Sequence, residues 1–533
     1  MLPIMKPNDY GVPTLYVKEK PFLILGGEIH NSSSSSVSYM EEKVWPALRP
    51  LAINTVIAPV YWETCEPEEG SFSFELVDSL ILQSRREEKK LILLWFGIWK
   101  NGESMYAPAW IKENPALYFR SCYHPADPSD TVSPLCAEAI RADARAFSRL
   151  MAHLRDFDQE ENTVLMVQVE NEIGFLGAER DFSPAARKAY ESPVPQAMFD
   201  AALQLPQVNS ALMPNAVLGN SWYETFGRNA PELFMTWYYA QAIETIASAG
   251  KKEYPIPMNV NAWLEQFPEI PGSYPCGGPI AKYMTLWQRL APSIDLFSPD
   301  IYVSDFKGVC DAYAAHNNPL FIPEARRDPV SASNVFYAFG QYNALGFSPF
   351  GIEDFFPVTD PQKLPASPIG NDLAILQELN IDLSASNAAG TGPYLQKSYL
   401  VLNNMLELLA SCRGSGKIHA FIRKNEHDRG IILPLPSCDV KLTYTGGRPD
   451  MPGSAGFIIE NGSDGFYIAG CNFIVELLAQ TGSGRKISIT ELAEGSFEHG
   501  QFCPVRILNG DERMRASIGP MAEILSFRFC LYP

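Results

Sequence analysis

The feature that most constrains the fold is a regular alternation of strand-like and helix-like stretches from residue 20 onward. Runs rich in apolar and β-branched residues alternate with segments, such as 75–90 and 137–157, whose apolar residues recur at three- and four-residue spacing. This alternation is typical of parallel βα units. The expected strands cover residues 21–27, 54–62, 90–97, 162–170, 256–263, 296–302, 319–325 and 346–353.

Eight such strands predict an α/β fold, a (β/α)₈ TIM barrel. An open, doubly wound sheet is the competing fold, but no G-x-G-x-x-G follows the first strand. Helical stretches over residues 370–412 are expected to close the barrel. Residues 417–533 then show short alternating runs broken by Gly, Asn and Ser, which predict an antiparallel β-sandwich. The expected domains are therefore 1–412 and 413–533, and we expect no catalytic carboxylate from the second.

Charge and cysteine usage exclude several classes of protein. The formal net charge is −19, from 61 acidic and 42 basic residues, which disfavours nucleic acid and anionic membranes as partners. No run of eighteen apolar residues would span a bilayer. The ten cysteines form no C-x-x-C pair and no Cys/His cluster, and the start lacks a secretion-signal pattern. We expect a cytoplasmic protein with reduced thiols, and self-association into a homo-oligomer stays open.

The stretch "VLMVQVENEIG", residues 164–174, carries the strongest indication of function. An apolar strand ends there in Glu170, Asn171 and Glu172, and carboxylates are costly to bury unless they are paired or used. In a barrel, functional groups project from the C-terminal ends of the strands. Glu170 and Glu172 share the same strand parity, so parity does not separate them. Glu172 lies further toward the rim and is the stronger candidate.

A second carboxylate, Glu324, ends the seventh strand, across the barrel mouth from the fourth. Glycoside hydrolysis uses two such groups, a protonated acid and an ionised nucleophile. Tyr302 could donate a hydrogen bond that keeps the nucleophile ionised, and Asn171 could hold a substrate hydroxyl. No phosphate-binding loop, serine elbow or metal-spaced histidine pair is present. We therefore expect no metal and no organic cofactor.

The remaining strand ends supply candidate sugar-binding groups, with a carbohydrate as the expected partner. Aromatic residues make up 12% of the chain, and flat rings stack on the apolar faces of sugars. His30 is expected to be structural. The candidates are the stacking residues Trp99 and Trp263 and the polar residues Asn261, Glu63, Glu28 and Glu353.

Several segments resemble family 35 β-galactosidases, a group of retaining glycosidases built on (β/α)₈ barrels. The likeness covers roughly residues 20–411 and resembles a bacterial branch with a small C-terminal β-domain. The segments that carry it are "LGGEIHNSS", "NTVIAPVYWETCEPEEGSFSF", "VQVENEIG", "LLWFGIWKNGESMYAPAW", "TWYYAQAIETIASAGKKEYPIPMNVNAWL" and "SPDIYVSDF".

The resemblance implies that Glu172 is the acid/base and Glu324 the nucleophile of a retaining exo-hydrolase acting on terminal β-galactose. The chain departs from the family at Glu63 and Cys65, where the family has Asn and His that help bind galactose. "FGIWKNG" likewise replaces a C-A-E segment. Three alternatives remain open: another β-glycosidase of the same clan, acting on glucosides or arabinosides, an endo-acting hydrolase, and a non-catalytic carbohydrate-binding barrel.

Overall fold

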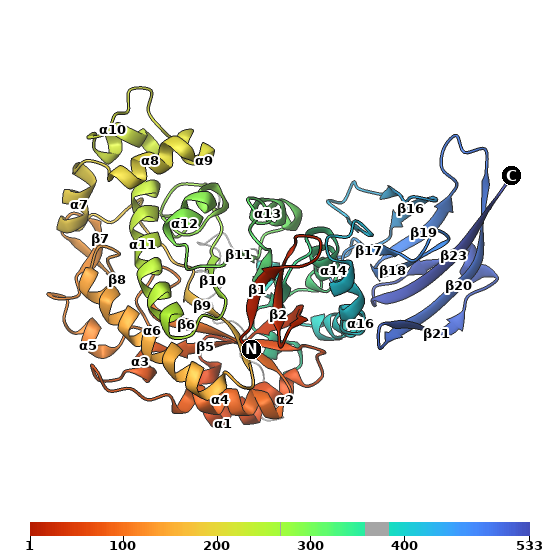
Figure 1. Cartoon of the computed structure of the whole chain (residues 1–533), viewed down its shortest axis with the longest axis horizontal. Helices are drawn as coiled ribbons and strands as arrows, with labels where there is room; N and C mark the ends of the chain where they lie inside the picture. Colours follow the sequence, from red (N-terminus) through yellow and green to blue (C-terminus); the bar gives the residue numbers. More distant parts are fainter. Residues whose placement is uncertain (267, 358–382) are drawn as a thin grey trace.

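The computed structural model describes residues 1–266, 268–357 and 383–533. Eight parallel strands close into a barrel in the order β4-β5-β6-β9-β10-β11-β12-β13, so the predicted TIM barrel is confirmed (Figure 1). Every predicted strand overlaps an observed one. The barrel strands are β4 (Ile24–Glu28), β5 (Thr55–Tyr61), β6 (Lys90–Lys100), β9 (Val164–Asn171), β10 (Met258–Ala262), β11 (Leu296–Ile301), β12 (Phe321–Ala325) and β13 (Gly346–Pro349).

Amphipathic helices cover the outside of the barrel. In α4 the buried residues Val77, Leu80, Ile81 and Ser84 follow the helical repeat, so one face packs on the sheet. Among the described residues, no helix is both long and apolar enough to cross a membrane. The larger helices are α4 (Glu75–Arg86), α6 (Ala137–Asp158), α7 (Pro184–Glu191), α8 (Gln196–Gln204), α11 (Ala230–Glu253), α12 (Met284–Leu290), α13 (Phe306–Tyr313), α14 (Ser331–Tyr342) and α16 (Thr391–Cys412).

The barrel interior changes from apolar to polar along its axis. Its N-terminal end is filled by an apolar cluster that includes Ile24 and Leu296, and the hairpin β1 (Ile4–Pro7) and β2 (Pro13–Val17) adds Leu15 and Val17 beneath it. Closer to the C-terminal ends of the strands, polar side chains fill the barrel: Asn259 Nδ2 donates to Gln168 Oε1 at 3.1 Å and to Ser298 Oγ at 3.4 Å. Because Ile24 and Leu296 point inward, alternation along their strands directs Glu28 and Asp300 into the mouth.

The C-terminal region is an antiparallel β-sandwich, as predicted. Its two sheets have the orders β14-β17-β18-β23-β20-β21 and β15-β16-β19-β22, and an apolar core lies between them. The strands are β14 (Ile418–Ile422), β15 (Gly430–Pro434), β16 (Asp439–Tyr444), β17 (Ala455–Glu460), β18 (Gly465–Cys471), β19 (Phe473–Leu478), β20 (Lys486–Glu498), β21 (Gln501–Ile507), β22 (Ser517–Ile518) and β23 (Glu523–Tyr532).

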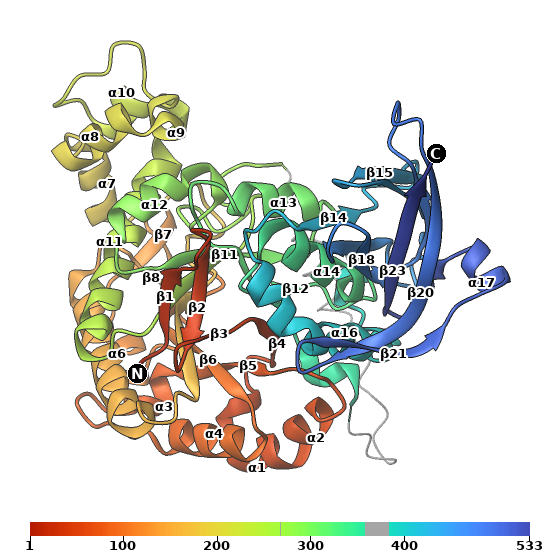
Figure 2. The same cartoon turned by 45° about the vertical axis from the view of Figure 1, so that its right-hand side comes forward.

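Two helices join the barrel to the sandwich. Helices α14 and α16 lie between the two units in both views (Figures 1 and 2), and α14 contacts β14 and β17. The outer-face residues Phe457, Ile459 and Ile524 of the larger sheet belong to the same apolar core as the barrel. The division predicted at residue 412 coincides with the end of α16, and the predicted helical stretch over 370–382 lies outside the described residues.

Arg413 ties the end of α16 to the start of the chain. Its guanidinium donates to the backbone oxygens of Ala344 and Pro13, both at 2.9 Å, and to Thr14 Oγ1 at 3.3 Å. Asn8 Nδ2 donates back to the Arg413 carbonyl oxygen at 3.0 Å. Burial lowers the pKa of Arg413 to about 10. We call this set of contacts the Arg413 clasp; it fixes the hairpin across the bottom of the barrel.

Candidate active site

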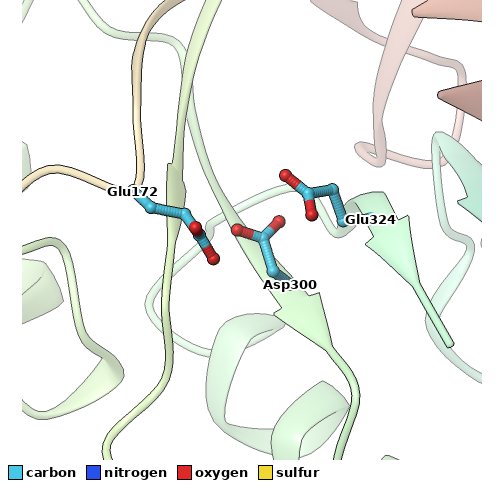
Figure 3. Close-up of side chains that lie close together, drawn as sticks. All are labelled: Glu172, Asp300 and Glu324. Carbon is cyan, nitrogen blue, oxygen red and sulfur yellow. The ribbon is translucent and has the colours of Figure 1, made fainter. Parts of the chain in front are cut away.

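Three carboxyl groups converge at the barrel mouth, from three different strands. Glu172 directly follows β9, Asp300 lies in β11 and Glu324 in β12. One carboxylate oxygen of each lies within 4.8 Å of those of the other two, and all three side chains are buried (Figure 3). Glu172 and Glu324, paired from the sequence, therefore face each other across the barrel mouth.

An irregularity in β12 turns Glu324 inward. Phe321 belongs to the interior cluster, so strict alternation would direct Pro323 and Ala325 inward and Glu324 outward. The pairing with β13 instead shifts register between Ile322 and Ala325, where β12 has one residue more than its partner. A β-bulge of this kind reverses the facing of the residues that follow. It places the Glu324 carboxylate in the mouth.

Hydrogen-bond donors surround the Glu324 carboxylate. The Tyr302 hydroxyl donates to Oε2 at 2.7 Å, which is the contact predicted from the sequence. Asn171 Nδ2 and Asn261 Nδ2 donate to Oε1 at 3.3 and 3.4 Å. Donors aimed at both oxygens stabilise the ionised form. The Tyr302 proton is firmly held, because burial and the charge of Glu324 raise the Tyr302 pKa well above its ordinary value.

Glu172 has a different environment. Burial, followed by the negative charge of Glu324, raises the pKa of Glu172 to about 8, while Lys100 acts in the opposite direction. Its backbone is held where its N–H donates to Asn261 Oδ1 at 2.9 Å, and its φ of 45° is unusual for a residue with a side chain. Glu172 therefore carries a proton at neutral pH, opposite an acceptor-only Glu324.

Glu170 is separated from Glu172 by backbone geometry. A φ of 60° at Glu170 interrupts the alternation of β9. Its carboxyl accepts hydrogen bonds from the backbone N–H groups of Gly97, Ile98 and Trp99, at 2.8–3.2 Å. Burial and the neighbouring Asp143, to which it is hydrogen-bonded, raise its pKa well above the ordinary value. Glu170 therefore braces β6 and does not face Glu324.

Two site residues were missed from the sequence. Lys100 is buried at the end of β6, where its Nζ donates to Asn171 Oδ1 at 2.8 Å. A lysine closing the apolar run "KLILLWFGIWK" was a usable signal, because a buried ammonium needs a partner. Asp300 accepts from Asn261 Nδ2 at 2.7 Å through Oδ2. Asp300 lies two residues before Tyr302, which was chosen as the candidate because it follows the strand. Alternation along the strand from the inward-facing Leu296 would have predicted that Asp300 faces the mouth.

Glu28 and Glu353 both lie at the mouth. Glu28 is fully buried, and neither of its carboxylate oxygens has a hydrogen-bond partner among the described residues. Burial, then the charge of Glu324, raises its pKa well above the ordinary value. Glu353 Oε1 accepts from the His30 backbone N–H at 3.0 Å and from Ser33 Oγ at 2.7 Å. Glu353 thus anchors the loop after β4, while its Oε2 has no partner among the described residues.

Other predicted sugar-binding residues are placed differently. The prediction that Trp99 stacks on the sugar is wrong, because its ring is fully buried. Its Nε1 donates to Val132 O at 3.0 Å, and the ring packs edge-on against Tyr239. A register shift between Trp95 and Lys100 turns this part of β6. The amide oxygen of Asn261 accepts from the Glu172 backbone N–H, and its nitrogen donates to Asp300 and Glu324. Asn261 therefore positions these three residues.

Glu63 and Trp263 lie at the edge of the barrel mouth. Glu63 is exposed and forms an ion pair with Lys112 at 3.5 Å. Trp263 directly follows β10 and is half-buried, so its stacking role stays a prediction. His30 bonds Asp354 at 2.8 Å, in keeping with a structural role.

The three converging carboxyls also resemble a cation site, but their partners do not fit one. Carboxylates that ligate a metal are ionised, whereas burial and neighbouring negative charge raise the pKa of Glu172 and of Asp300. Here Tyr302 donates to Oε2 of Glu324, two amides donate to Oε1, and Asn261 occupies Oδ2 of Asp300. The set has the chemistry of an acid facing an ionised base.

Parts of the chain are similar to known proteins. Residues 14–269 match the family model "Glycosyl hydrolases family 35", and residues 395–517 match a domain of unknown function (DUF5597). The human protein "Beta-galactosidase-1-like protein 3" is 27% identical over 187 residues, which is 34% of this chain and 26% of the relative. The chain thus spans about a quarter of that relative's length.

Two solved structures are weakly similar to this chain. A β-galactosidase from Bacillus circulans sp. alkalophilus has a TM-score of 0.47 and 11% identity, covering 95% of this chain and 99% of that one. The catalytic domain of a β-amylase from Paenibacillus polymyxa has a TM-score of 0.47 and 12% identity, covering 68% and 98%.

The family match agrees with the resemblance found in the sequence: residues 14–269 are similar to family 35 glycoside hydrolases. Glu172 lies within the matched residues and Glu324 beyond them, so the assignment of the second carboxylate depends on the geometry of the mouth.

Proposed function

We propose that this family 35 glycoside hydrolase releases terminal β-linked galactose from the ends of oligosaccharides or glycoconjugates, with retention of configuration. The observation that carries the proposal is the approach of Glu172 and Glu324 to within 4.8 Å in unequal environments. Retaining enzymes hold their carboxyl groups ~5–5.5 Å apart, whereas inverting enzymes leave about 6.5–9.5 Å for a water molecule. The short separation supports the retaining reaction.

The reaction then proceeds in two displacements. Glu324 attacks the anomeric carbon while Glu172 gives its proton to the leaving oxygen, which forms a glycosyl–enzyme bond and releases the aglycone. Water then attacks the same carbon while Glu172, now ionised, accepts its proton; the bond between that carbon and Glu324 breaks, which releases the sugar and restores the Glu324 carboxylate. Tyr302, Asn171 and Asn261 stabilise the Glu324 carboxylate before attack and after release.

Galactose as the released sugar is supported by the family match and by the name of the human relative. Glu63 and Cys65 replace residues that help bind galactose in the family; Glu63 is exposed and Cys65 is buried. Relative kcat/KM values for galactosides and related glycosides therefore test the identity of the released sugar.

A panel of aryl β-glycosides tests the proposal directly. We expect the highest kcat/KM on the β-galactoside, release of single sugars from oligosaccharides, and the β-anomer as the first product seen by NMR. Preference for a glucoside or an arabinoside would reassign the sugar. Mid-chain cleavage would indicate an endo-acting enzyme. Sugar binding without turnover on any substrate would indicate a carbohydrate-binding barrel.

A further inference from the structure

Asp300 lies at the centre of the carboxyl cluster. Its side chain is 3% exposed and lies between Glu172 and Glu324 (Figure 3). Oδ2 accepts from Asn261 Nδ2 at 2.7 Å, but Oδ1 has no hydrogen-bond partner among the described residues. A buried polar atom without a partner is costly and uncommon in proteins. Such an atom at the centre of a reaction site points to a group that arrives with the substrate.

The protonation state of Asp300 follows from its contacts. Burial and the negative charges of Glu324 and Glu172 raise its pKa well above the ordinary value, which favours the neutral form. Because Oδ2 accepts the Asn261 N–H, the proton resides on Oδ1. Asp300 therefore presents an O–H donor to the gap between the two glutamates.

That gap is where the reacting sugar must lie. In the two-step reaction proposed above, the anomeric carbon sits between Glu324 and Glu172, and the ring hydroxyls surround it. We propose that Asp300 is a substrate-binding residue whose Oδ1 hydrogen-bonds one ring hydroxyl of the sugar, with Asn261 fixing its other oxygen. Asp300 then selects substrates that carry this hydroxyl. The inference rests on the proposed function and specifies how its sugar is held.

Two substitutions separate a neutral donor from other roles. In Asp300→Asn, the amide oxygen can accept from Asn261 while the amide nitrogen donates into the gap, so we expect kcat/KM within about tenfold of wild type. Asp300→Ala removes the donor, and we expect a loss of about 10- to 100-fold, the size of one or two lost hydrogen bonds. If Asp300→Asn is as impaired as Asp300→Ala, Asp300 acts as an ionised group and the proposal is wrong.

Monodeoxy aryl β-galactosides identify the hydroxyl. We expect one position at which the deoxy analogue is poor for wild type but loses nothing further in Asp300→Ala, whereas at the other positions the two losses add. Asp181→Asn is the matched control, because Asp181 is buried and bonded to Cys122, Ser133 and Ser183. It should lower thermal stability without coupling to any hydroxyl. Additive losses at all positions in Asp300→Ala would overturn the proposal.

Two further measurements distinguish the remaining outcomes. If Mg²⁺, Ca²⁺ or Mn²⁺ restores activity after chelation of wild type, the carboxyls hold a cation and the proposal fails. If wild type cleaves no aryl β-glycoside, the proposed function is wrong, but titration with galactose by NMR still tests Asp300. Equal affinity of wild type and Asp300→Ala in that titration would overturn its role in binding.

Discussion

The barrel mouth and the C-terminal sandwich handle charge in opposite ways. The mouth buries the carboxyl groups of Glu28, Glu172, Asp300, Glu324 and Glu353, and three of these residues have oxygens without a partner among the described residues. In residues 414–533, all of which are described, no charged side chain is buried and no buried side-chain polar atom lacks a partner. Charged pairs there, such as Lys441–Glu476, lie at the surface.

This difference shows which part of the fold contains groups that lower the free energy of unfolding. Buried carboxyls without partners weaken the folded state, because water no longer solvates them. The sandwich, which packs against α14 and α16, contains nothing comparable. Residues that lower stability in exchange for chemistry are found at functional sites. The contrast agrees with the proposal that the reaction takes place at the mouth, and the predictions below test it from the largest effect to the smallest.

Removal of the nucleophile should have the largest effect. Glu324→Ala should lower kcat on the best aryl substrate on the order of 10⁶-fold, as when a covalent nucleophile is lost elsewhere. Added azide could then yield only the α-glycosyl azide. Mass spectrometry with a 2-fluoro glycoside should trap the sugar on Glu324 in the wild type. A sugar trapped on Glu170 would refute the assignment.

Removal of the acid should have a smaller, substrate-dependent effect. General acid help contributes about 10²–10⁴-fold, and it matters least when the leaving group is already good. Glu172→Ala should therefore keep partial activity on activated aryl glycosides. Azide should accelerate its second step and give the β-glycosyl azide. The roles of the two residues would have to be exchanged if Glu172→Ala gave the α-product.

The pH dependence of the wild type should report Glu172. Its pKa is raised from 4.5 to about 8, so the protonated, active form is lost as pH rises through that value. We expect kcat/KM to fall about tenfold per pH unit above this point. The fall should vanish in Glu172→Ala on activated substrates. A basic limb that persists unchanged in the variant would have to come from another group.

The unpartnered carboxyl of Glu28 should be replaceable with a gain in stability. Glu28→Leu should raise the free energy of unfolding by about 1–3 kcal/mol, because an unsatisfied buried group is removed. Glu232→Leu is the matched control: Glu232 is also buried but accepts from Tyr274 and from the Gly277 N–H, so we expect a loss of similar size. Chemical denaturation measures both, and a marked destabilisation in Glu28→Leu would contradict the comparison.

A surface pair of the sandwich should show the smallest effect. Lys441 and Glu476 are cross-strand neighbours on β16 and β19, 2.6 Å apart and about half exposed. Exposed ion pairs are worth roughly 0–1 kcal/mol, so Lys441→Ala should shift the unfolding midpoint little and leave kcat/KM unchanged. A loss above about 2 kcal/mol would show that the sandwich also depends on charge.

The sequence predicted the barrel well because periodicity reports which residues are buried, and burial decides strand position. It also predicted that Glu172 and Glu324 face each other and that Tyr302 contacts Glu324, since these residues lie at strand ends; their catalytic roles stay a prediction. Local departures from alternation were not predictable. The bulge that turns Glu324 inward and the φ of 60° that turns Glu170 away depend on pairing with neighbouring strands, which no single segment reveals.

The same limitation explains Trp99, Lys100 and Asp300. Trp99 was placed at the mouth because it follows the third strand, but that strand continues to Lys100 through an irregular register and turns the ring into the core. Lys100 donates a hydrogen bond to Asn171, a residue of β9 that lies 71 positions later in the chain. Asp300 was overlooked in favour of its more conspicuous neighbour, although strand parity would have selected it.

The Arg413 clasp has a consequence for how the chain folds during synthesis. Its contacts with Asn8, Pro13 and Thr14 join residues separated by 399–405 positions, so the hairpin cannot be fixed at the base of the barrel until Arg413 has left the ribosome. Until then Leu15 and Val17 cannot be locked in place, and the nascent barrel presents an open apolar end. Contacts of such long range slow folding and prolong exposure to aggregation. Chain shortening before residue 413 should therefore yield a barrel that depends on chaperones, even though Glu172, Asp300 and Glu324 have all been synthesised by then.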